Sequence, residues 1–318
     1  MNRIKFLILT IVASASLFSC KKDDDGVYVA PPRDRATQYA ADLISIEDYL
    51  HTHYLEVTTD AHGNPIPRIF AIGEGTPQTS IWDQTEYPLQ FEMLKSDERI
   101  ATEANPYVGE LVDESVEYKF YYIKLREGNG NSPSQVDSTF ISYRGTNLSD
   151  VDFDYRENPV WINQSSVVSG WRKMMQKFKT GSATEDPENP GNVIFADHGI
   201  GVMFIPSGLG YFAVPRTNLP AYSPMVFTFN LIALKYSDND GDGIYSIYED
   251  VNGNGDLFDD DTDGDGFPNF LDNDDDGDGM LTLYEISDSF GNKYPFDLIP
   301  NCQGTTGGLK KHLDPSCQ

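Results

Sequence analysis

The sequence has few cysteines, few basic residues and, after its first twenty positions, no long apolar run. Three cysteines among 318 residues leave room for one intramolecular disulfide bond at most. The 23 lysines and arginines stand against 50 acidic residues, and this formal net charge of −27 argues against nucleic acid as a partner. No stretch beyond the N-terminus is apolar enough to cross a bilayer. The length allows two compact domains and flexible tails.

The first nineteen residues have the features of a signal peptide, because a cationic start is followed by a short apolar run from Phe6 to Phe18. Leu17-Phe18-Ser19-Cys20 resembles a bacterial lipobox, in which Cys20 becomes the lipidated first residue of the mature protein. The alternative is an ordinary secretory signal with an incidental cysteine. With attachment through more than one acyl chain, the protein would be held stably at a membrane. Residues 20–36 are expected to form a flexible tether.

The charges that follow Cys20 bear on localisation. Lys21-Lys22-Asp23-Asp24-Asp25 resembles an acidic surface-export tag of one group of Gram-negative lipoproteins, although a solvated charged tether explains it equally well. Lysine rather than aspartate at the second mature position argues against retention at the inner membrane. We therefore expect an outer-membrane lipoprotein that faces either the periplasm or the cell surface.

Residues 37–116 form an N-terminal accessory region without a functional signal. An amphipathic helix is predicted over residues 37–57, because five apolar side chains fall on one stripe. It would pack on the rest of the chain or pair with a partner helix. The remainder reads as irregular, with strand-like patches around residues 69–72 and 89–93. The stripe consists of Tyr39, Leu43, Ile46, Leu50 and Val57.

Residues 117–236 are rich in strands, and they carry the most informative pattern of the chain. Stretches with β-branched and aromatic residues predict strands at 120–125, 139–144, 202–205 and 225–234. One short helix is predicted from about Val167 to Phe178. The fold class is therefore α+β, with a curved antiparallel sheet around a short helix, preceded by the N-terminal helix and followed by an irregular array of calcium loops.

Within this segment, several apolar and aromatic motifs follow one another in a set order. They include Phe153-Asp154, Val167-Val168-Ser169-Gly170-Trp171 and Ser223-Pro224-Met225-Val226-Phe227. In order and spacing they resemble the FKBP-type peptidyl-prolyl isomerases, over a little more than a third of the chain. The resemblance implies an FKBP-like fold and a cup that binds proline. The alternative is that these residues merely form a core between a sheet and a helix.

Prolyl isomerisation explains why such a cup would be aromatic. Rotation about an X–Pro amide has a barrier of about 18–20 kcal/mol, and uncatalysed exchange takes tens of seconds or longer. Halfway through rotation the amide loses resonance and polarity, so a dry cup binds the twisted conformer better than water does. The reaction requires no nucleophile, metal or cofactor.

The resemblance gives each residue of the cup a role. Trp171 would be the floor under the proline ring, the Val168 N–H would hold the substrate carbonyl, and the Tyr211 hydroxyl would donate to the ligand. Asp154 matches the acid next to a wall phenylalanine. The walls would be Tyr143, Phe153, Val167, Val168, Leu219 and Phe227.

Some positions depart from the family pattern. Val160 stands where an aromatic wall residue is usual, and Phe212 replaces a glycine, so the loop after Tyr211 is expected to bend differently. Residues 182–202 read as an insertion beside the site that could act as a lid. These departures leave a noncatalytic, peptide-binding adaptor as an alternative to an active isomerase.

Residues 238–285 contain 17 acidic residues and no lysine or arginine. The acids have a register, with oxygen ligands at positions 1, 3, 5 and 12 and glycine at position 6 of four successive calcium loops. Asp261 would close the second loop and open the third. The predicted ligands are Asp238, Asp240, Asp242 and Glu249, then Asp250, Asn252, Asn254 and Asp261, then Asp261, Asp263, Asp265 and Asp272, and finally Asp274, Asp276, Asp278 and Glu285.

This array, assigned to residues 237–286, resembles thrombospondin type 3 and related bacterial calcium repeats. It predicts structural Ca²⁺ in a stiff spacer or docking stalk, because close carboxylates repel one another without cations. A disordered acidic tail is the alternative. In the C-terminal tail, residues 287–318, Cys302 and Cys317 would form a disulfide bond in an exported protein, or remain free thiols.

Together these features predict a lipid-anchored peptidyl-prolyl isomerase whose partners are proline-containing exported polypeptides. Two other classes of function stay open. One is the noncatalytic FKBP-like adaptor, and the other is a surface structural protein whose working part is the calcium array.

Overall fold

The computed structural model describes residues 31–60, 62–100, 109–111 and 115–317, and the description below concerns these residues. The expected signal peptide (1–19), the lipidation site Cys20 and the tether up to residue 30 lie outside them. The elements belong to a compact unit that begins at Arg33. Within this described part, none of the helices combines the length and the hydropathy needed to traverse a bilayer.

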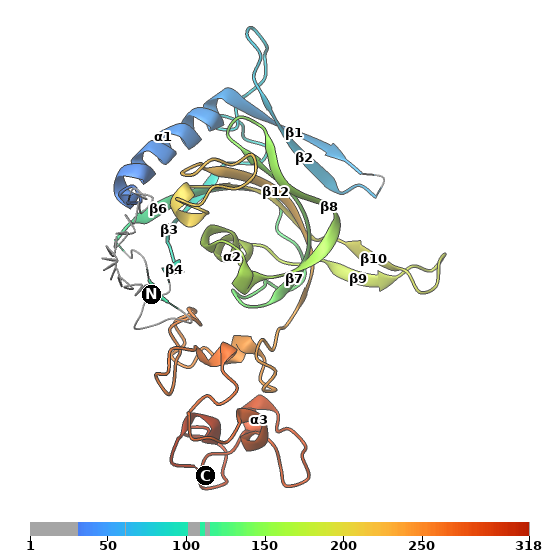
Figure 1. Ribbon diagram of the computed structural model, residues 1–318. Coiled ribbons are helices and arrows are strands. Elements are labelled where there is room, and N and C mark those ends of the chain that lie inside the picture. Colours follow the sequence, from blue (N-terminus) through green and yellow to red (C-terminus); the bar gives the residue numbers. More distant parts are fainter. Residues whose placement is uncertain (1–30, 61, 101–108, 112–114, 318) are drawn as a thin grey trace, which may run out of the picture. The chain divides into compact units, whose positions relative to one another are not determined.

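The central element is a six-stranded sheet in which every neighbouring pair of strands is antiparallel, with the order β3-β6-β11-β12-β7-β8. It curves around the short helix α2 (Figure 1). The α+β class and the mostly antiparallel sheet agree with the prediction. The strands of this sheet are β3 (Gln90–Lys95), β6 (Glu117–Arg126), β7 (Ser138–Asn147), β8 (Asp152–Asn163), β11 (Gly199–Ile205) and β12 (Met225–Lys235). The helices are α1 (Arg35–Thr52), α2 (Ser169–Met175) and α3 (Thr282–Glu285).

Both faces of the sheet are buried at β6. Side chains alternate along a strand, so neighbouring residues of β6 reach opposite faces. Phe120 and Tyr122 of β6 belong to the core that surrounds α2. Tyr121 and Ile123 point to the opposite face and join a second core with Ile46 and other residues of α1. The cup is therefore built on one face of a sheet that is fixed from both sides.

The N-terminal helix α1 is shorter than predicted. It begins after Asp34, whose carboxylate accepts a hydrogen bond from the Thr37 N–H at 2.8 Å, and it ends at Thr52 instead of residue 57. Its apolar stripe packs on the sheet of its own chain. The next residues form the strand β1 (His53–Thr59), which pairs with β2 (Pro65–Ala71). β-branched residues such as Val57 favour this strand, and the pairing partner lies too far along the sequence for a helical stripe to reveal it.

The accessory region is more ordered than the sequence predicts. β3 belongs to the main sheet and pairs with β6, so the sheet begins well before residue 117. A two-residue strand, β4 (Arg99–Ile100), pairs with β5 (Glu110–Leu111). The strand-like patches near residues 69–72 and 89–93 correspond to β2 and β3.

The insertion after α2 forms a hairpin of β9 (Ser182–Glu185) and β10 (Val193–Ala196). Phe195 on this hairpin contacts Phe140, with ring centroids 6.0 Å apart. Phe140 neighbours the core residue Ile141 on β7, and therefore faces the side of the sheet opposite α2. The interpretation of this insertion as a lid is wrong, because its hydrophobic contacts hold it on the outer face.

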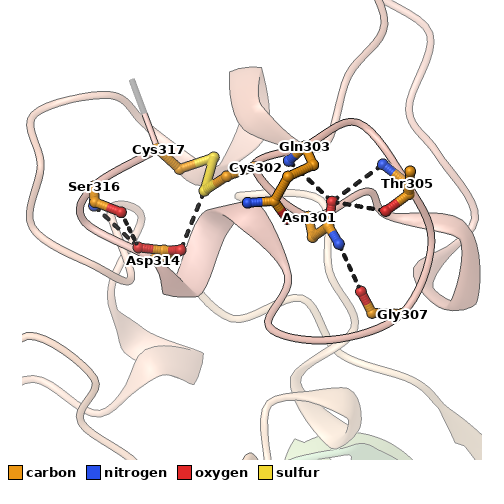
Figure 2. The surroundings of a disulfide bond; sticks show 8 residues. All are labelled: Asn301, Cys302, Gln303, Thr305, Gly307, Asp314, Ser316 and Cys317. Carbon is orange, nitrogen blue, oxygen red and sulfur yellow. Dashed lines mark hydrogen bonds between the residues drawn. A yellow bond between two sulfur atoms is a disulfide. The ribbon is translucent and has the colours of Figure 1, made fainter.

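The acidic segment is a run of compact loops with single-turn 3-10 helices and the short helix α3. The glycine at position 6 of each loop has a left-handed φ, between 83° and 105°, which other residues adopt only with strain. Ile244, Ile286 and Ile299 form a small core that joins the loops to the tail. In the tail, a disulfide bond links Cys302 to Cys317 (Figure 2). The 3-10 helices of the described residues, including those of the acidic segment, are Gln164–Ser166, Ser207–Leu209, Ser246–Tyr248, Asn269–Leu271, Phe296–Leu298 and Lys311–Leu313.

Candidate functional site

A small cup lies between the start of α2 and the concave face of the sheet. Its volume is about 110 Å³, which suits one ring-sized group and lies well below the roughly 300–1,000 Å³ of pockets for whole small molecules. It is lined by Tyr143, Asp154, Ile162, Ser166, Val167, Val168, Trp171, Tyr211 and Phe227.

The start of α2 fixes the floor of the cup. Val168 is extended, and the helix begins at Ser169, whose hydroxyl accepts a hydrogen bond from the Asp97 N–H at 3.2 Å. Gly170 lies against the sheet, where a Cβ atom would come within 2.9 Å of Ile205 and 3.0 Å of Phe120. The absence of a side chain at Gly170 lets the helix approach closely enough for Trp171 to lie in the core.

Trp171 is 4% exposed, and aromatic rings surround it. Its ring meets those of Tyr143 and Phe227 edge to face, with centroids 5.3 and 4.8 Å away. Such contacts contribute about 0.5–1.5 kcal/mol each beyond the burial of area. Phe153 supports the wall from behind, with its ring centroid 5.4 Å from that of Phe227.

The rim of the cup carries polar groups. The Tyr143 hydroxyl donates to Asp154 at 2.8 Å, and Asp154 also pairs with Arg156 at 3.3 Å. Burial and the Asp154 carboxylate raise the pKa of Tyr143 well above its usual value. Burial also raises the pKa of Tyr211, although the Arg216 guanidinium, 4.5 Å from its ring centroid, opposes the shift. Both hydroxyls therefore stay protonated at physiological pH.

Two hydrogen-bond donors of the cup lack acceptors in the described part of the chain. One is the backbone N–H of Val168, directly before α2. The other is the indole Nε1–H of Trp171, which is fully buried. Buried donors are nearly always paired in native structures. These two are consequently candidates for binding a carbonyl oxygen or water that enters the cup.

The structure brings seven of the nine predicted cup residues together in the lining. Phe153 and Leu219 lie behind it, in or against the same core. Ile162 and Ser166 line the cup but were not predicted. Ile162 stands two residues after Val160 on β8, so alternation places both on one face, and only the register of the sheet selects between them.

The loop after Tyr211 accommodates a phenylalanine where glycine is usual. Phe212 has a φ of 43°, in the left-handed region that favours glycine. Its ring packs edge to face on Tyr222, and the Arg35 guanidinium lies 4.3 Å from the ring centroid. These contacts hold Phe212 in the strained conformation and keep its side chain out of the cup.

The acidic loops form a second candidate site, and their backbone contacts repeat. In the fourth loop, the Asp278 N–H donates to Asp276 at 3.2 Å, and the Met280 N–H donates to Asp278 at 2.7 Å. The equivalent contacts recur in the other three loops. The aspartates at positions 3 and 5 are thus each held by one oxygen, which leaves the second oxygen for another partner, whereas Asn252 and Asn254 in the second loop each have only one side-chain oxygen.

Acidic side chains converge in groups that could hold a cation. In each group, one oxygen per residue lies within 4.8 Å of the others. The groups among the described residues are Asp238, Asp240 and Asp242; Asp242, Glu249 and Asp275; Asp261, Asp263 and Asp265; and Asp274, Asp276 and Asp278.

The second loop differs from this pattern. Asn252 and Asn254 donate to Asp259 at 3.0 and 2.9 Å, and Asp259 was not among the predicted ligands. The groups just named consist of carboxylates, so a loop with Asn252 and Asn254 as ligands does not enter them. The predicted sharing of Asp261 between two loops stays a prediction.

The electrostatics of the loops fit a hard cation with oxygen ligands. Burial, followed by repulsion from neighbouring carboxylates, raises the pKa of Glu249 to about 10 and that of Asp275 to about 9. The same causes raise the pKa of Glu285 to about 8. Both oxygens of these three carboxyls are buried and have no hydrogen-bond partner in the described chain. A divalent ion would satisfy these oxygens and favour their ionised form.

Comparisons with known proteins match two separate parts of the chain. The family model described as BamM C-terminal matches residues 239–307, which include most of the acidic loops and part of the tail. A search of curated proteins finds no match. In the loop region, where the sequence resembles calcium repeats, the matching family is thus the BamM C-terminal one.

The solved structures that match include a peptidyl-prolyl cis-trans isomerase and FKBP domains. A peptidyl-prolyl cis-trans isomerase from Pseudomonas syringae pv. tomato is 26% identical over 36% of this chain and 75% of its own, with a TM-score of 0.30. FkpA from Escherichia coli is 24% identical over 36% of this chain and 48% of its own, with a TM-score of 0.30. The N-terminal domain of FKBP42 from Arabidopsis thaliana is 14% identical over 44% of this chain and 98% of its own, with a TM-score of 0.29. These TM-scores are low, so the function of the chain is inferred from the geometry of the cup.

Proposed function

We propose that this protein is a peptidyl-prolyl cis-trans isomerase that acts on exported polypeptides. The observation that carries the proposal is the cup of about 110 Å³ with Trp171 as its floor. At its edge lies the Val168 N–H, which has no acceptor among the described residues. A recess of this size suits one ring-sized apolar group, such as the ring of a proline. The sequence motifs that resemble FKBP-type isomerases meet at this recess.

Each part of the cup would contribute to binding the twisted amide. The proline ring would lie against Trp171, and the Val168 N–H would hold the carbonyl of the substrate. Tyr211 supplies a hydroxyl at the rim that remains protonated, while the Tyr143 hydroxyl donates to Asp154. Because the twisted amide is less polar than the planar one, an apolar cup lowers the barrier by differential binding alone.

A pair of tryptophan variants tests the proposal. The full mature chain is assayed for isomerisation of a short X–Pro peptide, alongside Trp171→Phe and Trp161→Phe. Trp161 is a matched control, because it is 53% exposed and packs on Phe140 outside the cup. We expect Trp171→Phe to lose much of the rate and Trp161→Phe to keep it. A wild-type chain that does not accelerate the reaction would refute isomerase activity.

A noncatalytic adaptor is the second candidate. The family pattern has an aromatic wall residue at the position of Val160, whereas the wall of this cup on β8 is the aliphatic Ile162, and this departure favours the adaptor. Titration of the same X–Pro peptide distinguishes the two. An adaptor binds the peptide, and Trp171→Ala weakens this binding, yet the rate of isomerisation stays at its uncatalysed value.

We also propose that the acidic loops bind Ca²⁺ and that a lipid on Cys20 anchors the protein at the outer membrane. The buried carboxylates without partners support the first part. The match to the BamM C-terminal family model is compatible with a place at the outer membrane. For the anchor, Cys20→Ser should shift the protein from the membrane fraction to the soluble one or leave it unprocessed. An unmodified N-terminal residue other than Cys20 in the wild-type mature protein would exclude the anchor.

A further inference from the structure

Asp275 lies outside the register of predicted calcium ligands, because it occupies position 2 of the fourth loop. Nevertheless its carboxylate meets Asp242 and Glu249 of the first loop. One oxygen from each of the three side chains lies within 4.8 Å of the other two. Two oxygens on opposite sides of a calcium ion are separated by roughly 4.6–5.2 Å, given bonds of about 2.3–2.6 Å. The three oxygens are thus close enough to share one ion.

All three side chains are buried, and most of their oxygens lack hydrogen bonds. Asp242 and Asp275 are 1% exposed, and Glu249 is 3% exposed. Both oxygens of Asp275, both oxygens of Glu249 and one oxygen of Asp242 have no hydrogen-bond partner among the described residues. Buried carboxylates are normally paired or coordinate a metal. Among the described residues, these five oxygens therefore lack the hydrogen bonds that buried carboxylates need, as expected where a cation binds.

The backbone fixes Asp275 in this position. Its N–H donates to the hydroxyl of the fully buried Thr282 at 3.1 Å, and the Thr282 N–H donates to the Asn273 carbonyl at 3.0 Å. In the first loop, the Ile244 N–H holds one oxygen of Asp242 at 2.7 Å and leaves the other for a ligand. The backbone at Asp275 is therefore fixed beside the cluster, and the Asp242 carboxylate is held through one oxygen.

We propose that Asp242, Glu249 and Asp275 hold a divalent cation that joins the first loop to the fourth. Asp242 would bridge this ion to the one held by Asp238, Asp240 and Asp242. The Lys293 ammonium lies against Gly243. Its one positive charge and the four of two divalent ions would neutralise the five carboxylates of Asp238, Asp240, Asp242, Glu249 and Asp275. The proposal rests on the proposed calcium binding of the loops and adds a site between two of them.

The number of bound ions tests the site. The full mature chain is equilibrated with Ca²⁺, and native mass spectrometry counts the ions on the wild type, Asp275→Asn, Glu249→Gln and the double variant. Each single variant should bind one ion fewer than the wild type, and the double variant should lose no more than either single one. Asp288→Asn is the matched control, because Asp288 caps a local turn through the Phe290 N–H and belongs to none of the acidic groups.

A second measurement needs no variant and covers the case in which Asp275→Asn fails to fold. Hydrogen exchange of the wild type is followed during a Ca²⁺ titration, and peptides containing residues 242–249 and 275 should gain protection at the same midpoint. Separate midpoints, or an unchanged ion count in a folded Asp275→Asn, overturn the shared site. A wild type that binds no Ca²⁺ instead overturns the proposed calcium function itself.

Discussion

At the level of single side chains, the cup depends most on Trp171, because its ring contacts both walls. We expect Trp171→Ala to abolish binding of proline peptides and to reduce the free energy of unfolding by about 3–5 kcal/mol, as for other large buried aromatics. Urea denaturation measures the stability, and fluorescence anisotropy of a labelled peptide measures the binding. Normal binding by this variant would place the peptide site elsewhere.

The rim hydroxyls lead to a prediction about pH. The pKa values of Tyr143 and Tyr211 are raised, so both groups remain protonated donors throughout the neutral range. The isomerisation rate should therefore be flat between about pH 6 and pH 9. Stopped-flow assays of one peptide across this range check it, and a bell-shaped profile would mean that the reaction includes acid–base chemistry.

At the level of elements, a buried ion pair positions α2. Arg172 contacts Asp97 at 2.6 and 3.0 Å, and Lys173 adds a contact at 3.6 Å. Burial alone would raise the pKa of Asp97, but the charges of Arg172 and Lys173 hold it below its usual value. The pair therefore contributes stability above the unfolded pKa of about 3.9, and this contribution is lost as the pH falls through the lower folded value.

Removing this carboxylate should leave buried cations without a partner. Asp97→Asn is expected to lower the free energy of unfolding by about 3–5 kcal/mol at pH 7. The control is Glu92→Gln, which removes the more exposed pair with Lys177, at 2.8 Å, and should cost about 1 kcal/mol or less. Chemical denaturation of both variants tests the difference. Equal losses would show that α2 does not depend on its buried pair.

The elements also show which features the sequence could predict. Alternating apolar residues identified the strands around Phe120, Tyr143 and Phe227, because a half-buried strand has a period of two. The same reasoning extended the first helix to Val57, since a helical stripe contains no information about β1 pairing with β2. Residues 182–202 were interpreted as an insertion beside the cup for a similar reason, because the contact of their hairpin with Phe140 is non-local. The last residues of that range belong to β11 of the main sheet.

For the candidate sites, family resemblance located the cup, but register decided its details. Ile162 was missed because alternation alone cannot rank it above Val160. Asp275 was missed because the positions of a calcium loop are counted along one loop, whereas its nearest carboxylates belong to another. Contacts between segments that are distant in sequence account for each of these differences.

At the level of the whole molecule, the acidic loops should fold only with their ions. Trypsin is unsuitable for testing this, because residues 238–285 contain no lysine or arginine. Chymotrypsin can cleave after aromatic residues such as Tyr245 and Phe258. We expect cleavage within the loops in EDTA and protection in Ca²⁺, with a midpoint on the order of 10⁻⁴–10⁻³ M or tighter.

Magnesium serves as the control for this experiment. It requires a tighter octahedral site and gives up its water reluctantly, so it should protect the loops less than calcium at equal concentration. Identical cleavage patterns in EDTA and in Ca²⁺ would mean that the loops hold their structure without cations.

Several contacts tie the loops to the sheet and to α2. The Arg172 guanidinium of α2 lies 5.0 Å from the ring centroid of Phe258. Val136 at the end of the sheet is also buried against Leu257 and Phe270. In evolutionary terms, the loops are therefore not a cassette that recombination can exchange freely. A substitution at Phe258 would remove the ring that Arg172 meets, so recombination that replaced the acidic segment would have to restore this contact.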